Sequence, residues 1–317
     1  MKNIDVLALG ELLIDFTENG TSAQGNPILE ANPGGAPCNV LAMLARLGHK
    51  TAFIGKVGDD AFGAQLEAAI KEVGIDARGL SKDKDVHTTL AIVQTLKGGD
   101  RDFSFYRNPG ADMMLSEEDV DTSLIEDAKL FHFGTLSMTD EVCRRATQFA
   151  VAKAKESGAL ISFDPNLREP LWKSLDDAKK MAEYGMENCD ILKISDNEVV
   201  WFTGREDYDE GIKVIRDKYN IPLVLLSMGK DGSRAYYKDL KVDVAANVRK
   251  DTIETTGAGD TFCACVLHYV LEHGLEDLTE DGLKEMLRFA NVAASIVTTK
   301  KGALRVMPTK EEVEAQL

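Results

Sequence analysis

The chain has 317 residues, of which 44% are hydrophobic, and its formal net charge at pH 7 is −16. No basic stripe interrupts this acidic composition, which argues against nucleic acid as a partner, and no apolar run is long enough to span a membrane. The five cysteines lack Cys-x-x-Cys spacing, as is typical of free thiols in a reducing cytosol. We therefore expect a cytoplasmic protein that has neither a membrane nor a nucleic acid as its partner.

Short apolar runs alternate with amphipathic helical patterns along the chain. This alternation predicts an α/β fold with a mostly parallel central sheet and helices on both faces. We expect a single domain over residues 1–317, because no linker or repeat interrupts the pattern. In chain order, strands are predicted at 4–9, 51–54, 130–133, 159–163, 190–194 and 222–227, and helices at 38–47, 60–73, 140–157, 175–187, 209–219, 260–273 and 281–298.

Two regions break this alternation. Residues 11–33 and 87–107 contain short strand patterns with turns and no helix. The Gly98-Gly99-Asp100 turn in the second region suggests a hairpin. Because both regions follow early strands, they predict a small β-sheet lid that stands off the main sheet.

The stretch "DTIETTGAGDTFCACVLHYVLEHG" is rich in glycine and threonine just before an apolar helical pattern. Its helix is predicted to begin near Gly259 or Asp260. Gly257 and Gly259 lack a Cβ, so a ligand can approach the backbone closely. The helix N-terminus is suited to an anion, but the Asp260 carboxylate would compete with one unless it had its own task. An ordinary glycine-rich turn is the alternative.

A second stretch, "NPGGAPCNVLAMLARLGHKTAFIGKVGDDAFG", leads from two glycines into a helix. A tight turn and helix cap would explain it. Alternatively, the exposed backbone, Asn39 and Asp15 could bind the hydroxyl groups of a ligand. The strand that precedes it continues as "GELLIDF", which lacks a dinucleotide fingerprint, and the chain has no P-loop motif.

Together, "PGGAPCN", "GKVGDDAFG" and "TTGAGDTFCACVL" resemble the two signatures of the ribokinase-like (PfkB) carbohydrate kinases, in the same order and over essentially the whole chain. Five further segments are similar to fructokinases in particular: "LGELLIDF", "RNPGADMML", "FDPNLREPLW", "DILKISDNEVVWFTG" and "FANVAASIVTTKKGALRVMP". The resemblance implies a ribokinase-like fold and ATP-dependent phosphorylation of D-fructose to fructose 6-phosphate.

The resemblance also implies roles for individual residues. Asp260 would be the catalytic base, and Gly257, Ala258 and Gly259 would cradle the transferred phosphoryl group. The implied sugar contacts are Asp15, Gly34, Gly35, Asn39, Arg107 and Arg168. The implied ATP contacts are Ser195, Glu198, Ser227, Gly229, Gly257, Gly259 and Asn291. Glu198 would bind Mg²⁺ through water, and Glu254 and Thr256 are the candidates for K⁺.

The departures from the family pattern leave alternatives open. Ser195 stands where the family's Asn-x-x-Glu motif has asparagine, and Glu254 stands where K⁺-binding members have aspartate. The rival substrates are 2-keto-3-deoxygluconate, whose carboxylate Arg107 and Arg168 could pair with, and the sugars of other PfkB kinases. A non-catalytic sensor of sugar or nucleotide is a further alternative. The free strand edges of the lid predict a homodimer.

Overall fold

In the computed structural model, which describes residues 2–95 and 101–317, the main sheet has nine strands in the order β13-β12-β11-β10-β9-β8-β1-β4-β5. All neighbours from β11 to β5 are parallel, whereas β12 and β13 are added antiparallel. The strands are β1 (Ile4–Leu9), β4 (Thr51–Gly58), β5 (Ile75–Asp83), β8 (Ala128–Gly134), β9 (Leu160–Asp164), β10 (Ile191–Ser195), β11 (Leu223–Ser227), β12 (Ser233–Tyr237) and β13 (Leu240–Val244).

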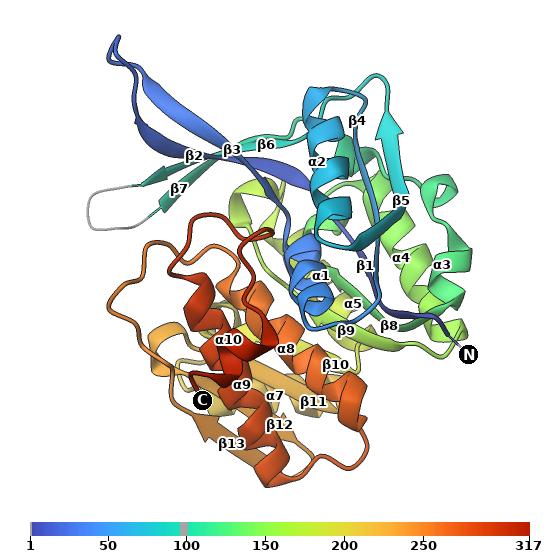
Figure 1. The fold of residues 1–317 in the computed structure, drawn as a ribbon. Helices are drawn as coiled ribbons and strands as arrows, with labels where there is room; N and C mark the ends of the chain where they lie inside the picture. The colour runs from blue at the N-terminus through green and yellow to red at the C-terminus, as the bar shows by residue number, and fades with distance from the viewer. Residues whose placement is uncertain (1, 96–100) are drawn as a thin grey trace.

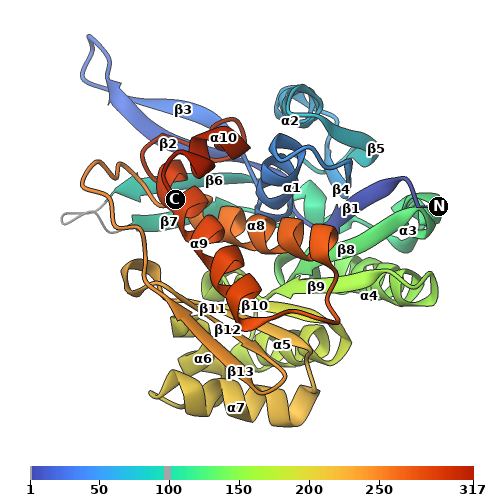
Figure 2. The ribbon, with the colours of Figure 1, turned by 60° about the horizontal axis from the view of Figure 1, so that its bottom comes forward.

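Helices cover both faces of this sheet and bury two separate apolar cores (Figure 2). On one face lie α1 (Ala36–Arg46), α2 (Ala61–Glu72), α8 (Ala258–His273), α9 (Glu280–Val297) and α10 (Lys310–Glu314). On the other lie α3 (Thr122–Glu126), α4 (Glu141–Glu156), α5 (Leu175–Asn188), α6 (Asp196–Thr203) and α7 (Tyr208–Tyr219). Within the two described ranges, no helix is both long and apolar enough to cross a bilayer.

The predicted α/β fold is confirmed, as are the central strands and the long helices. The elements that were not predicted are short or lie at the rim. β5 forms one edge of the sheet and exposes several polar side chains, and β12 and β13 form the opposite end. α3, α6 and α10 have at most eight residues, which is too short for a helical period to stand out.

The small sheet consists of β2 (Leu13–Thr21), β3 (Pro27–Gly34), β6 (Leu90–Thr95) and β7 (Arg101–Tyr106), in the order β3-β2-β6-β7. It comes from the two regions predicted to form a lid, and it projects away from the helices (Figure 1). β2 and β6 pair in parallel although some seventy residues separate them. The expected turn at Gly98-Gly99-Asp100 lies outside the described residues.

Candidate active site

A cavity of about 460 Å³ lies between the carboxyl ends of the central strands, the small sheet and the N-termini of α1 and α8. This edge of an open α/β sheet is where ligands generally bind. Eight predicted site residues line the cavity: Asp15, Gly35, Asn39, Arg168, Thr256, Gly257, Gly259 and Asp260. Residues more than two hundred positions apart in the chain therefore meet at one site.

The first turn of α8 has the geometry that favours an anion. Gly257 is its N-cap with φ +77°, and no side chain caps the helix there. A Cβ on Gly257 would lie 2.6 Å from the Cβ of Ala303, so both its conformation and its surroundings require glycine. The backbone N–H groups of this turn point toward the cavity end of the helix, where its dipole is positive. The arrangement favours a phosphoryl group at this position.

Asp260 lies in this same turn and faces α1. Asn39 Nδ2 donates a hydrogen bond of 2.8 Å to Asp260 Oδ2. Burial raises the pKa of the Asp260 carboxyl above its ordinary value, while the Asn39 hydrogen bond and the charges of Lys193 and Arg168 oppose the rise. The donor and the cations favour the ionised form of this partly buried carboxyl, which is the form that can accept a proton.

The turn before α1 brings the backbone close to the opposite wall of the cavity. Gly35 has φ +126°, and a Cβ there would collide with the carbonyl oxygen of Glu11. A Cβ on Gly34 would collide with the Asp15 carboxylate. Asn39 Oδ1 is buried and has no hydrogen-bond partner among the described residues. An unsatisfied acceptor of this kind favours a hydroxyl donor from a ligand.

Lys193 lines the cavity, although the sequence analysis did not single it out. Its Nζ lies 2.9 Å from Asp164 Oδ2, and the two side chains are only 8% and 5% exposed. Burial alone would lower the pKa of Lys193, but the Asp164 and Glu198 carboxylates raise it, so the ammonium stays charged. A Cβ on Gly259 would lie 3.4 Å from this ammonium. A fixed positive charge thus lies directly beside the anion-binding turn.

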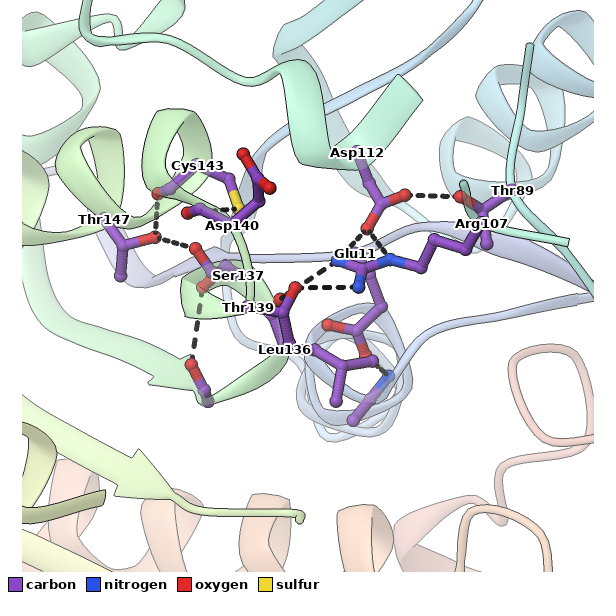
Figure 3. Close-up of polar contacts among 12 residues, drawn as sticks. Glu11, Thr89, Arg107, Asp112, Leu136, Ser137, Thr139, Asp140, Cys143 and Thr147 are labelled. Carbon is purple, nitrogen blue, oxygen red and sulfur yellow. Dashed lines mark hydrogen bonds and ion pairs between the residues drawn. The ribbon is translucent and has the colours of Figure 1, made fainter. Parts of the chain in front are cut away.

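Arg107 does not lie where the sequence predicted. Its guanidinium is buried in a network beside the cavity instead of extending from a lid strand (Figure 3). Nε lies 2.8 Å from Asp112 Oδ2, Nη1 lies 2.8 Å from Thr139 Oγ1, and Nη2 lies 3.0 Å from the Leu136 carbonyl oxygen. These contacts occupy all three nitrogens. Arg168, in contrast, does line the cavity.

Four residues predicted to contact the nucleotide lie at the carboxyl ends of β10 and β11, outside the cavity lining. Ser195 and Ser227 are register partners on these strands. Ser195 caps α6, and its backbone N–H and hydroxyl both donate to Glu198 Oε2. Glu198 Oε1 accepts the Leu167 N–H at 2.8 Å, which holds the loop that carries Arg168. Gly229, with φ +53°, follows β11.

Glu254 and Thr256 lie in the loop before α8, and Asn291 lies within α9. Asn291 hydrogen-bonds Ser233 and the carbonyl groups of Val244 and Ala245 and lines a second cavity of about 530 Å³. Glu254 Oε1 accepts the Gly302 N–H at 2.7 Å. Thr256 lines the main cavity and, with Glu254, a smaller one beside it.

Comparison with known proteins agrees with this geometry. The profile of the pfkB family of carbohydrate kinases matches residues 3–310. The chain is 42% identical over 307 residues to probable fructokinase-2 from Arabidopsis thaliana, covering 96% of this chain and 93% of that relative. An engineered double mutant of fructokinase from Vibrio cholerae O395, bound to fructose, ADP and potassium ion, superimposes with a TM-score of 0.87 at 27% identity over 99% of both chains. A structure described as ribokinase II from E. coli, in complex with ATP and Mg²⁺, superimposes with a TM-score of 0.86 at 25% identity over 98% of both chains. The chain therefore belongs to the pfkB family of carbohydrate kinases.

Proposed function

We propose that the protein transfers the γ-phosphoryl group of ATP to the primary 6-hydroxyl of D-fructose and releases fructose 6-phosphate and ADP. The observation that carries the proposal is the contact between Asn39 and Asp260 at the N-terminus of α8. Asp260, the α8 turn and the Asn39 amide meet at one point of the cavity, which supports their roles as proton acceptor, phosphoryl-binding turn and hydroxyl-binding group. The relatives named as fructokinases support fructose as the sugar.

The residues divide the chemistry between them. The 6-hydroxyl of the sugar lies between Asp260 and the α8 turn. The other hydroxyl groups of the sugar contact Asp15, Asn39 and the Gly34-Gly35 backbone. The hydroxyl oxygen bonds to the γ-phosphorus while the bond from that phosphorus to the β,γ-bridging oxygen breaks. Asp260 accepts the hydroxyl proton, and the N–H groups of the α8 turn stabilise the charge on the equatorial oxygens.

The nucleotide is expected to bind as its Mg²⁺ complex. Mg²⁺ usually keeps several waters and contacts one or two carboxylates besides the phosphates. Glu198 fits such a contact through water, because both its oxygens already accept protein hydrogen bonds and a carboxylate retains further acceptor sites. Ser195, Ser227, Gly229 and Asn291 would contact the nucleotide.

We assign the K⁺ candidates to the loop before α8. Glu254 and Thr256 line the small cavity next to the anion-binding turn, where a cation would offset phosphoryl charge. The structure with fructose, ADP and potassium ion supports a cation of this type. A dependence of kcat on K⁺ over Na⁺ that Glu254→Gln removes would be the expected result.

We further propose that residues 1–317 act as one kinase domain in which the small sheet closes over the sugar. Phe105 from β7 already lines the cavity, and closure would exclude water from the phosphoryl group.

β3 and β7 are the edge strands of the small sheet. β3 exposes 45% of Ile28 and 40% of Leu29, so a second subunit covering this sheet would give a homodimer.

A sugar panel with ATP tests the function. Fructose should give the highest kcat/KM, and ³¹P and ¹³C NMR should place the new phosphate on O6. A higher kcat/KM for 2-keto-3-deoxygluconate than for fructose would show that 2-keto-3-deoxygluconate is the substrate. The buried network of Arg107 argues against that outcome, because it leaves Arg168 as the one predicted arginine that lines the cavity. ATP binding without turnover of any sugar would indicate a sensor.

A further inference from the structure

Glu11 is a buried carboxyl group at the sugar side of the cavity that the proposed function does not use. It follows β1 in the chain, is only 5% exposed and lines the cavity together with Asp15 and Asn39. Its Oε1 accepts the Ala36 N–H at 2.8 Å, and its carbonyl oxygen is packed against Gly35. Glu11 therefore supports the Gly34-Gly35 turn through both its main chain and its side chain.

The Glu11 carboxyl retains acceptor capacity toward the cavity. The Ala36 N–H donates to Oε1, and the N–H of Glu11 itself helps to lower the pKa of the carboxyl. Among the residues drawn in Figure 3, a dashed line reaches one carboxyl oxygen of Glu11 and none reaches the other. A carboxylate has about four lone-pair sites, and a buried one is costly unless it is well hydrogen-bonded. A ligand hydroxyl in the cavity would satisfy the remaining sites.

Burial brings the pKa of the Glu11 carboxyl close to neutral pH. Burial raises its pKa to about 7; the Asp112 charge adds to the rise, while the backbone hydrogen bonds and the Arg107 charge oppose it. From α1, the Cys38 thiol faces it, and burial raises the pKa of that thiol well above its ordinary value, so it stays neutral. The charged groups that line the same cavity from β2, β10, α8 and the loop after β9 are Asp15, Lys193, Asp260 and Arg168.

We propose that Glu11 is a further sugar-binding residue, in which one carboxylate oxygen holds the Gly34-Gly35 turn through Ala36 and the other accepts a hydroxyl of the bound sugar. The inference rests on the proposed function. The ionised carboxyl is the stronger acceptor, so sugar affinity is highest when Glu11 is deprotonated. The sugar KM should therefore rise as the pH falls through about 7, while the ATP KM does not follow.

The test measures the KM for fructose and for ATP from about pH 5.5 to about pH 8.5 in the wild type and in Glu11→Gln. The amide oxygen of glutamine can still accept the Ala36 N–H, so the turn is retained. We expect the fructose KM of Glu11→Gln to be about tenfold above that of the wild type at high pH, independent of pH, and its ATP KM to be unchanged. Glu18→Gln is the matched control, because Glu18 lies on the exposed part of β2, and it should keep the wild-type pH profile.

Each outcome decides between the two proposals. Turnover of fructose with the same KM and pH profile in the wild type and Glu11→Gln would overturn the role of Glu11 alone. Failure of the wild type to phosphorylate any sugar would overturn the proposed function and this inference with it. If Glu11→Gln does not fold, the Glu11 carboxyl of the wild type can be titrated by ¹³C NMR. Its pKa should fall when fructose is added, and an unchanged midpoint would reject the hydrogen bond.

Discussion

Replacing Gly35 by alanine should damage the sugar site through the backbone. Gly35 has φ +126° and ψ 121°, a conformation that is essentially limited to glycine. The backbone strain alone should cost about 1–3 kcal/mol. The new Cβ would also collide with the Glu11 carbonyl oxygen and lie 3.2 Å from Leu12 Cα, both of which are main-chain atoms that cannot rotate away. Overpacking of this kind adds about 1–3 kcal/mol, so we expect about 2–6 kcal/mol in total.

Gly48→Ala provides the matched control. Gly48 also has a positive φ, +90°, but a Cβ there would meet no atom within 4 Å, so the control carries the backbone strain without the collision. Urea denaturation should show Gly35→Ala to be less stable than Gly48→Ala. Because relief of the collision must move the turn before α1, the fructose KM should rise about tenfold or more in Gly35→Ala while the ATP KM changes little. Equal stability of the two variants together with an unchanged fructose KM would refute this reasoning.

Four other predictions concern the site and the lid. Asp260→Asn should fold normally and bind both substrates but lose about 10²–10⁴-fold in kcat; near-normal turnover would remove Asp260 from the mechanism. Arg107→Ala should lower the free energy of unfolding by about 3–5 kcal/mol, because it leaves the buried Asp112 carboxylate unpaired, and urea denaturation that matches the wild type would contradict this. Folding raises the pKa of the Glu11 carboxyl from 4.5 to about 7, so its contribution to stability is complete below about pH 4.5 and is lost as the pH rises through 7. Relative to Glu11→Gln, the wild type should therefore lose about 3 kcal/mol of unfolding free energy between about pH 4.5 and pH 8. Stability curves that stay parallel for the two proteins would show that Glu11 titrates normally. Fructose should slow amide exchange in β6, and unaltered exchange there would argue against closure of the lid.

Much of the fold could be predicted from the sequence because its central elements have strong periodicity. After Asp190, the run predicted as a strand at 190–194 is apolar apart from Lys193, as expected for a strand that is buried on both faces. α8 could be placed to within two residues because glycines mark both of its ends. The short strands β12 and β13 were missed. β12 has the sequence Ser-Arg-Ala-Tyr-Tyr, which does not alternate regularly. β13 has the sequence Leu-Lys-Val-Asp-Val, whose alternation of apolar and charged residues is a strand signal that the sequence analysis did not use.

The resemblance pointed to several glycines and to Asp260, which line the cavity, but it did not point to the buried ion pair of Lys193 with Asp164. Lys193 appeared to be a single polar residue within a strand. Its partner, Asp164, lies on the neighbouring strand, and the register that pairs Leu192 with Phe163 is what brings the two together. Arg107 was placed in a lid strand by position, whereas its ion pair with Asp112 lies in a turn that follows the lid. Ion pairs between residues on different strands or turns depend on strand register and side-chain packing, and a single sequence does not reveal either.

The contact between Asn39 and Asp260 joins residues that are 221 positions apart in the chain. During synthesis, the first strands and α1 leave the ribosome long before α8 exists. Contacts of such long range form late in folding, because the entropy of closing the intervening chain must first be overcome. A nascent or truncated chain that ends before residue 260 therefore lacks the proposed base altogether, however well its first half is folded. Turnover then requires synthesis to pass residue 260, and a fragment that ends earlier is not expected to consume ATP.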